Sequence, residues 1–186
     1  MTYYFTRTTE GNEIKVEEDT EIETYAHTAY TDCIYILFMG ENVSYDDEYE
    51  LVEQQKAIIY TQTNDDRFLI IGVTSGTADD RADMEAIMEE TWGDRYINLR
   101  EVLSDEDILT SAGITVTDED RRQMAEGLVP DCVRVDEVHY TVTGYSIVAD
   151  AVYNRMTELG YFDEVNQMAE RYSKKWGWIQ EIKNAF

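Results

Sequence analysis

The sequence has 186 residues, of which 43% are hydrophobic and 12% aromatic, and this composition indicates a globular domain with a sizeable core rather than a disordered chain. Its formal net charge is −25 at pH 7. A charge of this sign argues against sequence-independent binding to nucleic acid or to anionic membranes, because both need a basic surface, and we expect neither as a partner.

Residues 2–31 are expected to form a β-rich segment. The short runs Tyr3–Thr6, Glu13–Val16 and Glu21–Tyr25 combine β-branched and aromatic side chains and show no helical period. Glu10-Gly11-Asn12 joins the first two runs as a hairpin turn. By itself this pattern predicts an edge hairpin at the start of the chain.

Residues 32–162 alternate between strands and helices. Almost continuously apolar runs predict strands, buried on both faces, at 34–39, 67–74 and 96–99. Helices are predicted at 46–63, 79–92, 104–110, 117–126, 143–159 and 162–183. Strands that alternate with helices indicate an α/β domain with a parallel sheet and right-handed crossovers. The polar stretch 100–130 is expected to cap a site, and 163–186 is expected to be a helical extension.

Two polar turns follow the first two predicted strands. Gly40-Glu41-Asn42 comes after 34–39, and Ser75-Gly76-Thr77 comes after 67–74. The carboxyl ends of parallel strands meet at one edge of a sheet, so the hydroxyls of Ser75 and Thr77 are candidates for lining a pocket there. The alternative is that these residues simply form turns.

A carboxylate and an imidazole, Asp136 and His139, lie three residues apart just before the helix predicted at 143–159. An aspartate close to a histidine can accept the ring N–H, fix the tautomer and stabilise the imidazolium. A loop that enters a helix at the rim of a sheet can hold both side chains where α/β folds bind ligands. The alternative is an N-cap aspartate beside a surface histidine.

The sequence predicts no metal, cofactor or membrane span. Cys33 and Cys132 form no Cys-x-x-Cys motif, and a disulfide between them lacks support. The two histidines and the scattered acids show no metal-ligand spacing. No stretch approaches ~18 continuous apolar residues, and Met1–Arg7 lacks the pattern of a signal peptide. As written, the chain is expected to stay in the cytoplasm.

Two of these motifs together resemble the SGNH (GDSL-type) hydrolases. Asp-x-Val-His at 136–139, followed by Thr-x-x-Gly-Tyr at 141–145, resembles the last block of that family. An apolar strand that ends in Gly40-Glu41-Asn42 resembles its Gly-x-Asn block. The resemblance spans residues 32–162 and implies a flavodoxin-like, three-layer α/β fold. In some members a β-rich insertion precedes the Gly-x-Asn strand, and residues 1–31 resemble the end of such an insertion.

The resemblance also implies roles for individual residues. His139 would be the general base, Asp136 its orienter, and Asn42 a donor to the oxyanion, with Gly40, Ser75 and Thr77 in the substrate region. The implied substrate is an ester, such as an O-acetyl group on a carbohydrate. Glu41 departs from the family's commonest pattern, as does Val43, which leaves the substrate contacts open.

The family's nucleophile is the feature that this sequence lacks. The family carries Gly-Asp-Ser before its Gly-x-Asn block, and no Gly-Asp-Ser occurs in these 186 residues. The resemblance therefore implies the C-terminal part of an SGNH hydrolase, incomplete at its N-terminal side. Ser44 and Ser75 are candidate replacements, but neither is placed in a tight strand-to-helix elbow.

These observations leave two functions open. One is a hydrolase fragment that is inactive as an isolated chain. The other is a non-catalytic binding or structural module with the same fold, in which the β-rich start and Trp176 with Trp178 form the partner surface. In either case strand 34–39 is expected to lack a neighbour, so we expect a symmetric homodimer or the missing N-terminal half to cover it.

Overall fold

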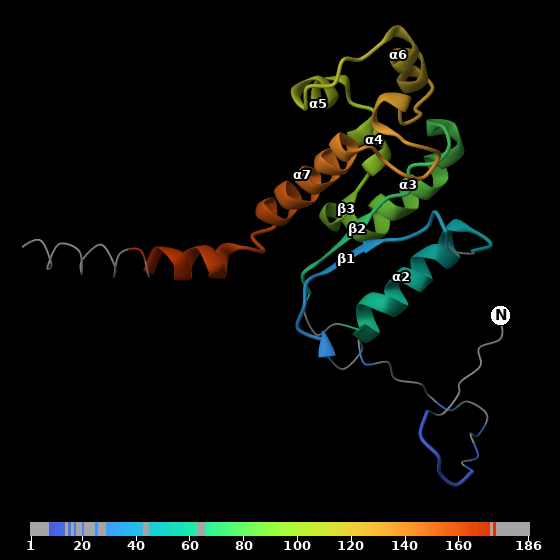
Figure 1. Ribbon diagram of the computed structural model, residues 1–186, viewed down its shortest axis with the longest axis vertical. Helices are drawn as coiled ribbons and strands as arrows, with labels where there is room; N and C mark the ends of the chain where they lie inside the picture. Colours follow the sequence, from blue (N-terminus) through green and yellow to red (C-terminus); the bar gives the residue numbers. More distant parts are fainter. Residues whose placement is uncertain are drawn as a thin grey trace, which may run out of the picture.

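A three-stranded parallel sheet organises the chain in the computed structural model, which describes residues 8–13, 15, 17, 20, 25, 29–42, 45–62, 66–171 and 173 (Figure 1). The strands are β1 (Tyr35–Phe38), β2 (Phe68–Ile71) and β3 (Tyr96–Ile97), in the order β1-β2-β3. This confirms the predicted α/β class and the parallel sheet.

Register places equivalent apolar residues side by side across the sheet. Ile36 of β1 pairs with Leu69 of β2, and Phe38 pairs with Ile71. The strands are shorter than predicted, and Leu99 was wrongly assigned to the third strand. The side chain of Asn98 accepts a hydrogen bond from the Glu101 N–H at 3.3 Å and so starts a helix at Leu99 instead.

Helices connect and cover the strands. They are α2 (Glu48–Gln62), α3 (Ala78–Trp92), α4 (Leu99–Leu103), α5 (Glu106–Ser111), α6 (Asp118–Ala125) and α7 (Val142–Glu158), with 3₁₀ turns η1 (Gly93–Arg95) and η2 (Asp131–Val133). Their starts follow from local capping: Thr77 and Thr117 each form a reciprocal box with the aspartate three residues later. Among the α-helices named above, α4 is the one that was not predicted.

Two apolar clusters lie on opposite faces of the sheet. On one face Ile70 and Phe68 pack with α2 and α3. On the other, Leu69 and Ile71 pack with α4 and α7. Figure 1 shows α2 and α7 on opposite sides of the strands, which makes three layers. Parallel strands need such cover on both faces, because their side chains are apolar on both.

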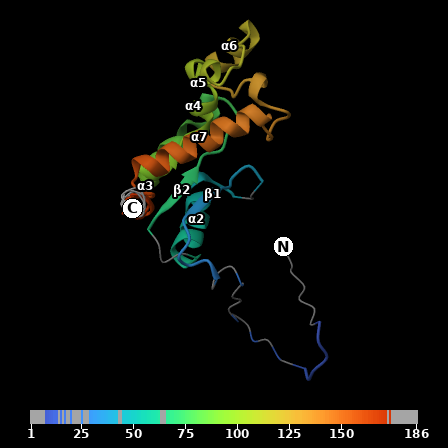
Figure 2. The same cartoon turned by 60° about the vertical axis from the view of Figure 1, so that its left-hand side comes forward.

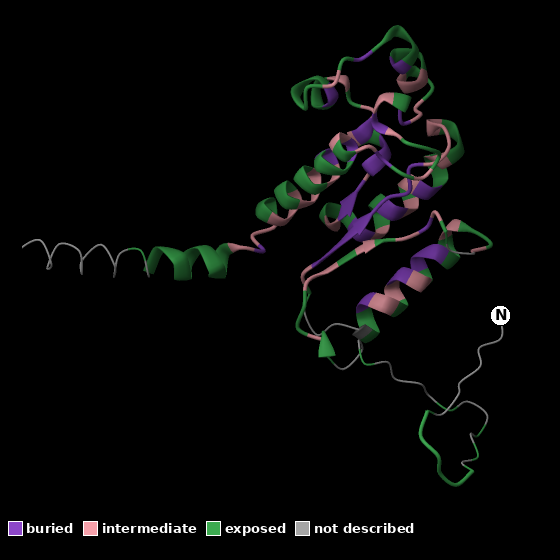
Figure 3. Cartoon of the chain, viewed as in Figure 1, coloured by how far each residue is buried: buried purple, intermediate pink, exposed green. Residues whose placement is uncertain are grey.

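The cover is incomplete over β1. Ile36 and Phe38 are 46% and 45% exposed, whereas their paired neighbours Leu69 and Ile71 are 0% and 1% exposed. Figure 3 shows the same contrast along the two strands, and Figure 2 shows α7 turned toward β2 and away from α2. The helical layer formed by α7 therefore stops short of the outer strand.

The terminal predictions are tested only in part. Residues 8–13 form bends and irregular chain, and most of the β-rich segment predicted at 2–31 lies outside the described residues, so it stays a prediction. Residues 163–171 are helical, and the rest of the helix predicted at 162–183 lies largely outside them too. In the part of the chain that the structure describes, no helix has the length and apolarity needed to cross a bilayer.

Candidate active site

Asp136 and His139 face each other in a tight loop between η2 and α7. The loop is closed by an antiparallel bridge between Arg134 and Tyr140, and by the Val135 N–H, which donates to the His139 carbonyl at 2.8 Å. Within it, Asp136 Oδ2 lies 2.8 Å from His139 Nδ1. This is the orienting contact that the sequence predicted, and it leaves Nε2 as the ring nitrogen available for proton transfer.

Asp136 is held as a carboxylate. Its Oδ1 accepts the backbone N–H groups of Val138 at 2.9 Å and His139 at 2.8 Å. The Val138 N–H, the His139 ring and the His139 N–H together lower the pKa of Asp136 to about 2. The loop thus fixes the ionised side chain that orients the imidazole.

The start of α7 explains the Thr-x-x-Gly-Tyr pattern. The Thr141 side chain accepts from the Gly144 N–H at 3.1 Å and caps the helix. A Cβ on Gly144 would lie 2.6 Å from the carbonyl oxygen of Val133, so only glycine lets the helix approach η2 this closely. The close packing of α7 on η2 determines the position of the loop that carries His139.

Gly40 turns the chain at the end of β1. Its φ is +133°, a conformation that side chains disfavour, and a Cβ there would lie 2.4 Å from Val73 Cγ1. The glycine therefore permits both the turn and the packing against Val73. Asn42 follows two residues later with an exposed side chain.

One pocket brings the two predicted motifs together. It has a volume of about 270 Å³ and is lined by Phe38, Met39, Gly40, Glu41, Asn42, Val138, His139 and Tyr145. The imidazole of His139 and the amide of Asn42, which can donate hydrogen bonds, thus share a small cavity, while Asp136 contacts the imidazole from outside that lining. Phe38, Met39, Val138 and Tyr145 contribute apolar and aromatic side chains to its walls. Such a set can move a proton and stabilise a developing oxyanion.

Ser75 and Thr77 lie near this pocket in the fold but do not line it. The Arg81 guanidinium donates to Ser75 Oγ at 2.6 Å, and Thr77 Oγ1 accepts from the Asp80 N–H at 3.2 Å as the cap of α3. Ser44 lies outside the described residues. No serine, threonine or cysteine among the described residues lines the pocket.

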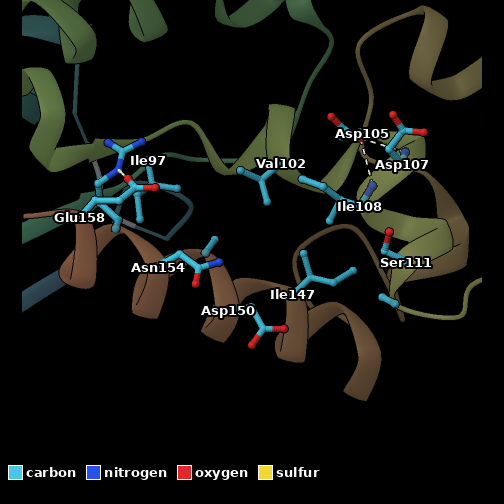
Figure 4. Close-up of a pocket in the computed structure, with 13 residues that line it drawn as sticks. Ile97, Val102, Asp105, Asp107, Ile108, Ser111, Ile147, Asp150, Asn154 and Glu158 are labelled. Atoms are coloured by element: carbon cyan, nitrogen blue, oxygen red, sulfur yellow. Dashed lines mark hydrogen bonds and ion pairs between the residues drawn. The ribbon is translucent and has the colours of Figure 1, made fainter.

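A larger groove of about 560 Å³ runs between α5 and α7 (Figure 4). Ile97, Val102 and Ile147 form apolar lining, and Asp105, Asp107, Asp150 and Glu158 contribute carboxylates. The Asp105 side chain is occupied as the cap of α5, where it accepts from the Asp107 and Ile108 N–H groups at 2.9 and 3.0 Å. The stretch 100–130, predicted to cap a site, lines this groove and not the pocket of His139.

Comparison of the chain with protein-family models, with curated proteins and with solved structures gives no match in any of the three. Among the described residues, no group of three or more histidine, cysteine, aspartate or glutamate side chains is placed to hold a metal ion. The interpretation of the pocket therefore depends on its geometry and on the motifs at 40–42 and 136–145.

Sequence reasoning gave no role to Glu41 and Tyr145, which line the pocket, or to Tyr140, which follows His139. Glu41 Oε1 accepts the Thr74 N–H at 2.6 Å, and the rings of Tyr140 and Tyr145 meet edge to face at 5.2 Å. Glu41 stands between Gly40 and Asn42, and Tyr140 directly follows His139. The signal available in the sequence was that these three residues lie within or directly beside the two motifs.

Proposed function

We propose that this chain carries the acid–base half of an SGNH-type ester hydrolase with a flavodoxin-like sheet. His139 is the general base, Asp136 orients it, and the Asn42 side chain donates to the oxyanion. The observation that carries the proposal is the convergence of His139 and Asn42, which are far apart in sequence, on one pocket at the end of β1.

The nucleophile in this proposal is a serine on a Gly-Asp-Ser segment, supplied in cis or in trans. His139 Nε2 removes the serine proton as Oγ attacks the ester carbonyl, and Asn42 stabilises the resulting oxyanion. The imidazolium then protonates the departing alcohol and an acyl-serine remains. Water, deprotonated by His139, then attacks the acyl carbonyl, the acyl group leaves as the carboxylic acid, and the imidazolium returns its proton to the serine Oγ.

The exposure of β1 indicates where that segment would pack. Ile36 and Phe38 are half exposed on the face that α7 leaves open, and Phe38 also lines the pocket. A parallel strand beside β1 would end at the same edge of the sheet as β1 does, next to Asn42. The helix after that strand would cover Ile36 and Phe38 beside α7.

The size of the pocket favours a small acyl group as the part of the substrate that binds in it. Its volume is about 270 Å³, and Phe38, Met39 and Tyr145 give it apolar and aromatic walls. An acetyl or another short acyl ester, including an O-acetyl group on a carbohydrate, suits that size.

Trans-complementation tests the proposal. The purified chain is mixed with a strand–loop–helix polypeptide that bears Gly-Asp-Ser, and hydrolysis of p-nitrophenyl acetate is followed. We expect negligible turnover from either part alone and turnover from the mixture, lost when the serine of the segment is changed to alanine. A complex that forms but shows no turnover would reject the hydrolase and favour a binding module. Turnover by the chain alone, abolished by His139→Ala, would place the nucleophile within these 186 residues.

A further inference from the structure

Glu41 joins two loops that belong to different strands. Its Oε1 accepts the backbone N–H of Thr74 at 2.6 Å and that of Ser75 at 3.0 Å. Those two residues follow β2, whereas Glu41 follows β1. A carboxylate that accepts two consecutive N–H groups ties the turn at 40–42 to its neighbour by charge-assisted bonds, which are stronger than neutral ones.

The connection continues from Thr74 to the loop of His139. The Thr74 side chain is buried, its Oγ1 lies 3.4 Å from Glu41 Oε1, and it shares a hydrogen bond with the Tyr140 hydroxyl. Tyr140 is also buried and directly follows His139. A chain of polar contacts therefore runs from the Asn42 turn, through Glu41 and Thr74, to Tyr140 in the loop of His139.

Glu41 and Tyr140, the two ends of this chain of contacts, differ in ionisation. Burial alone would raise the pKa of Glu41, but hydrogen bonds from Ser75 and Thr74 and the charge of Arg81 outweigh it and lower the pKa overall, so the carboxylate only accepts. Burial raises the pKa of Tyr140 to about 12, so its hydroxyl keeps its proton. In its contact with Glu41 the Thr74 hydroxyl is therefore the donor, whereas in the contact between Thr74 and Tyr140 either hydroxyl can donate.

We propose that Glu41 is a positioning residue that, through Thr74 and Tyr140, holds the turn of Asn42 in a fixed relation to the loop of His139. Asn42 itself has an exposed side chain. Gly40 packs on Val73 but offers no side chain to anchor the turn. Glu41 supplies that anchor, so the oxyanion donor and the base keep one geometry. The catalytic consequence of this inference rests on the proposed function, but the structural coupling does not.

The coupling is tested on the whole chain by ¹⁵N relaxation of the Asn42 backbone and side-chain amides at neutral pH. We expect Glu41→Gln to make Asn42 more mobile, Glu41→Ala to do so further, and Tyr140→Phe to produce the same change from the opposite loop. Glutamine keeps one acceptor oxygen, so its smaller effect separates anchoring from a general loss of packing. Glu90→Gln and Tyr60→Phe, both at exposed sites, are the matched controls.

An unchanged Asn42 in Glu41→Gln and Glu41→Ala would overturn the role of Glu41. An unchanged Asn42 in Tyr140→Phe alone would overturn the link to the His139 loop. If Glu41→Ala fails to fold, Glu41→Gln and Tyr140→Phe still decide the question. In the complemented hydrolase, Glu41→Gln should lower kcat about tenfold or more with KM unchanged, because small misplacements of catalytic groups are costly. Loss of all hydrolysis with the coupling intact would reject the proposed function and leave this inference standing.

Discussion

β1 and β2 are neighbouring parallel strands with similar apolar sequences, YILF and FLII, but they are covered differently. Every residue of β2 is buried, whereas β1 alternates between half-buried and exposed residues. The difference lies in what packs on them, because α7 covers Leu69 and Ile71 and stops before Ile36 and Phe38. The uncovered strand is also the one that ends at the pocket of His139, so its open face is where the proposed serine-bearing segment would pack.

The largest effects are expected in the complemented hydrolase. His139→Ala should lower kcat by about 10⁴–10⁶-fold, because the serine loses its base. Asn42→Ala should cost about 10²–10³-fold, as expected for one oxyanion donor. Steady-state kinetics on a short acyl ester measure both, and Val142→Ala, at an exposed site on α7, serves as the control. An Asn42→Ala enzyme with full activity would refute the role given to Asn42.

The open face of β1 predicts the next effect. Ile36→Lys should weaken binding of the complementing segment at least about tenfold, which corresponds to ~1.4 kcal/mol, because a charge would then lie in the apolar contact. Val142→Lys carries the same change at an exposed site away from the strand. Calorimetric titration of each variant with the complementing segment measures the two affinities. Equal affinities for Ile36→Lys and Val142→Lys would show that β1 is not part of the proposed contact.

Without the segment, we expect the chain to self-associate as a symmetric dimer through the same surface, since open strands pair readily. Light scattering at micromolar concentrations should show a dimer for the parent chain and a monomer for Ile36→Lys. A parent chain that is strictly monomeric under these conditions would argue against this assembly.

The contrast between the strands also predicts that substitutions in β1 and β2 differ in their effect on stability. Leu69→Ala should lower the free energy of unfolding by about 2–5 kcal/mol, because it opens a cavity in a closed core. Ile36→Ala should cost about 1 kcal/mol, since half of that side chain is already in water. Urea unfolding with a constant m-value measures both. Equal losses would mean that β1 is covered in solution.

The sequence predicted where β1 and β2 lie, because their apolar runs are nearly continuous. The rule that parallel strands end at one edge suggested Ser75 and Thr77 as pocket residues, but neither lines the pocket. The approach of Asn42 to His139 was an expectation from the family resemblance. The sequence pattern failed at Leu99, where a side-chain cap from Asn98 outweighed the apolar run. It also missed the contact of Glu41 with Thr74, because a contact between loops that follow different strands depends on the tertiary fold and not on local pattern.

The smallest effect concerns pH. The pKa of Asp136 is lowered to about 2 from an ordinary value near 4, so its contribution to stability is present above pH ~4 and is lost as the pH falls toward 2. Asp136→Asn should remove this part of the pH dependence, with Asp79→Asn, on the exposed first turn of α3, as the control. A titration of the Asp136 carboxyl carbon by NMR with a midpoint near 4 would contradict the hydrogen-bonded loop.

The central claim is that the pocket at the end of β1 activates a serine brought by another segment. A fluorophosphonate probe, which reacts covalently with activated serines, tests this most directly. We expect the probe to label the Gly-Asp-Ser segment rapidly when the chain is present, and slowly when the chain is absent or carries His139→Ala. Equal labelling of the segment in all three cases would contradict the claim.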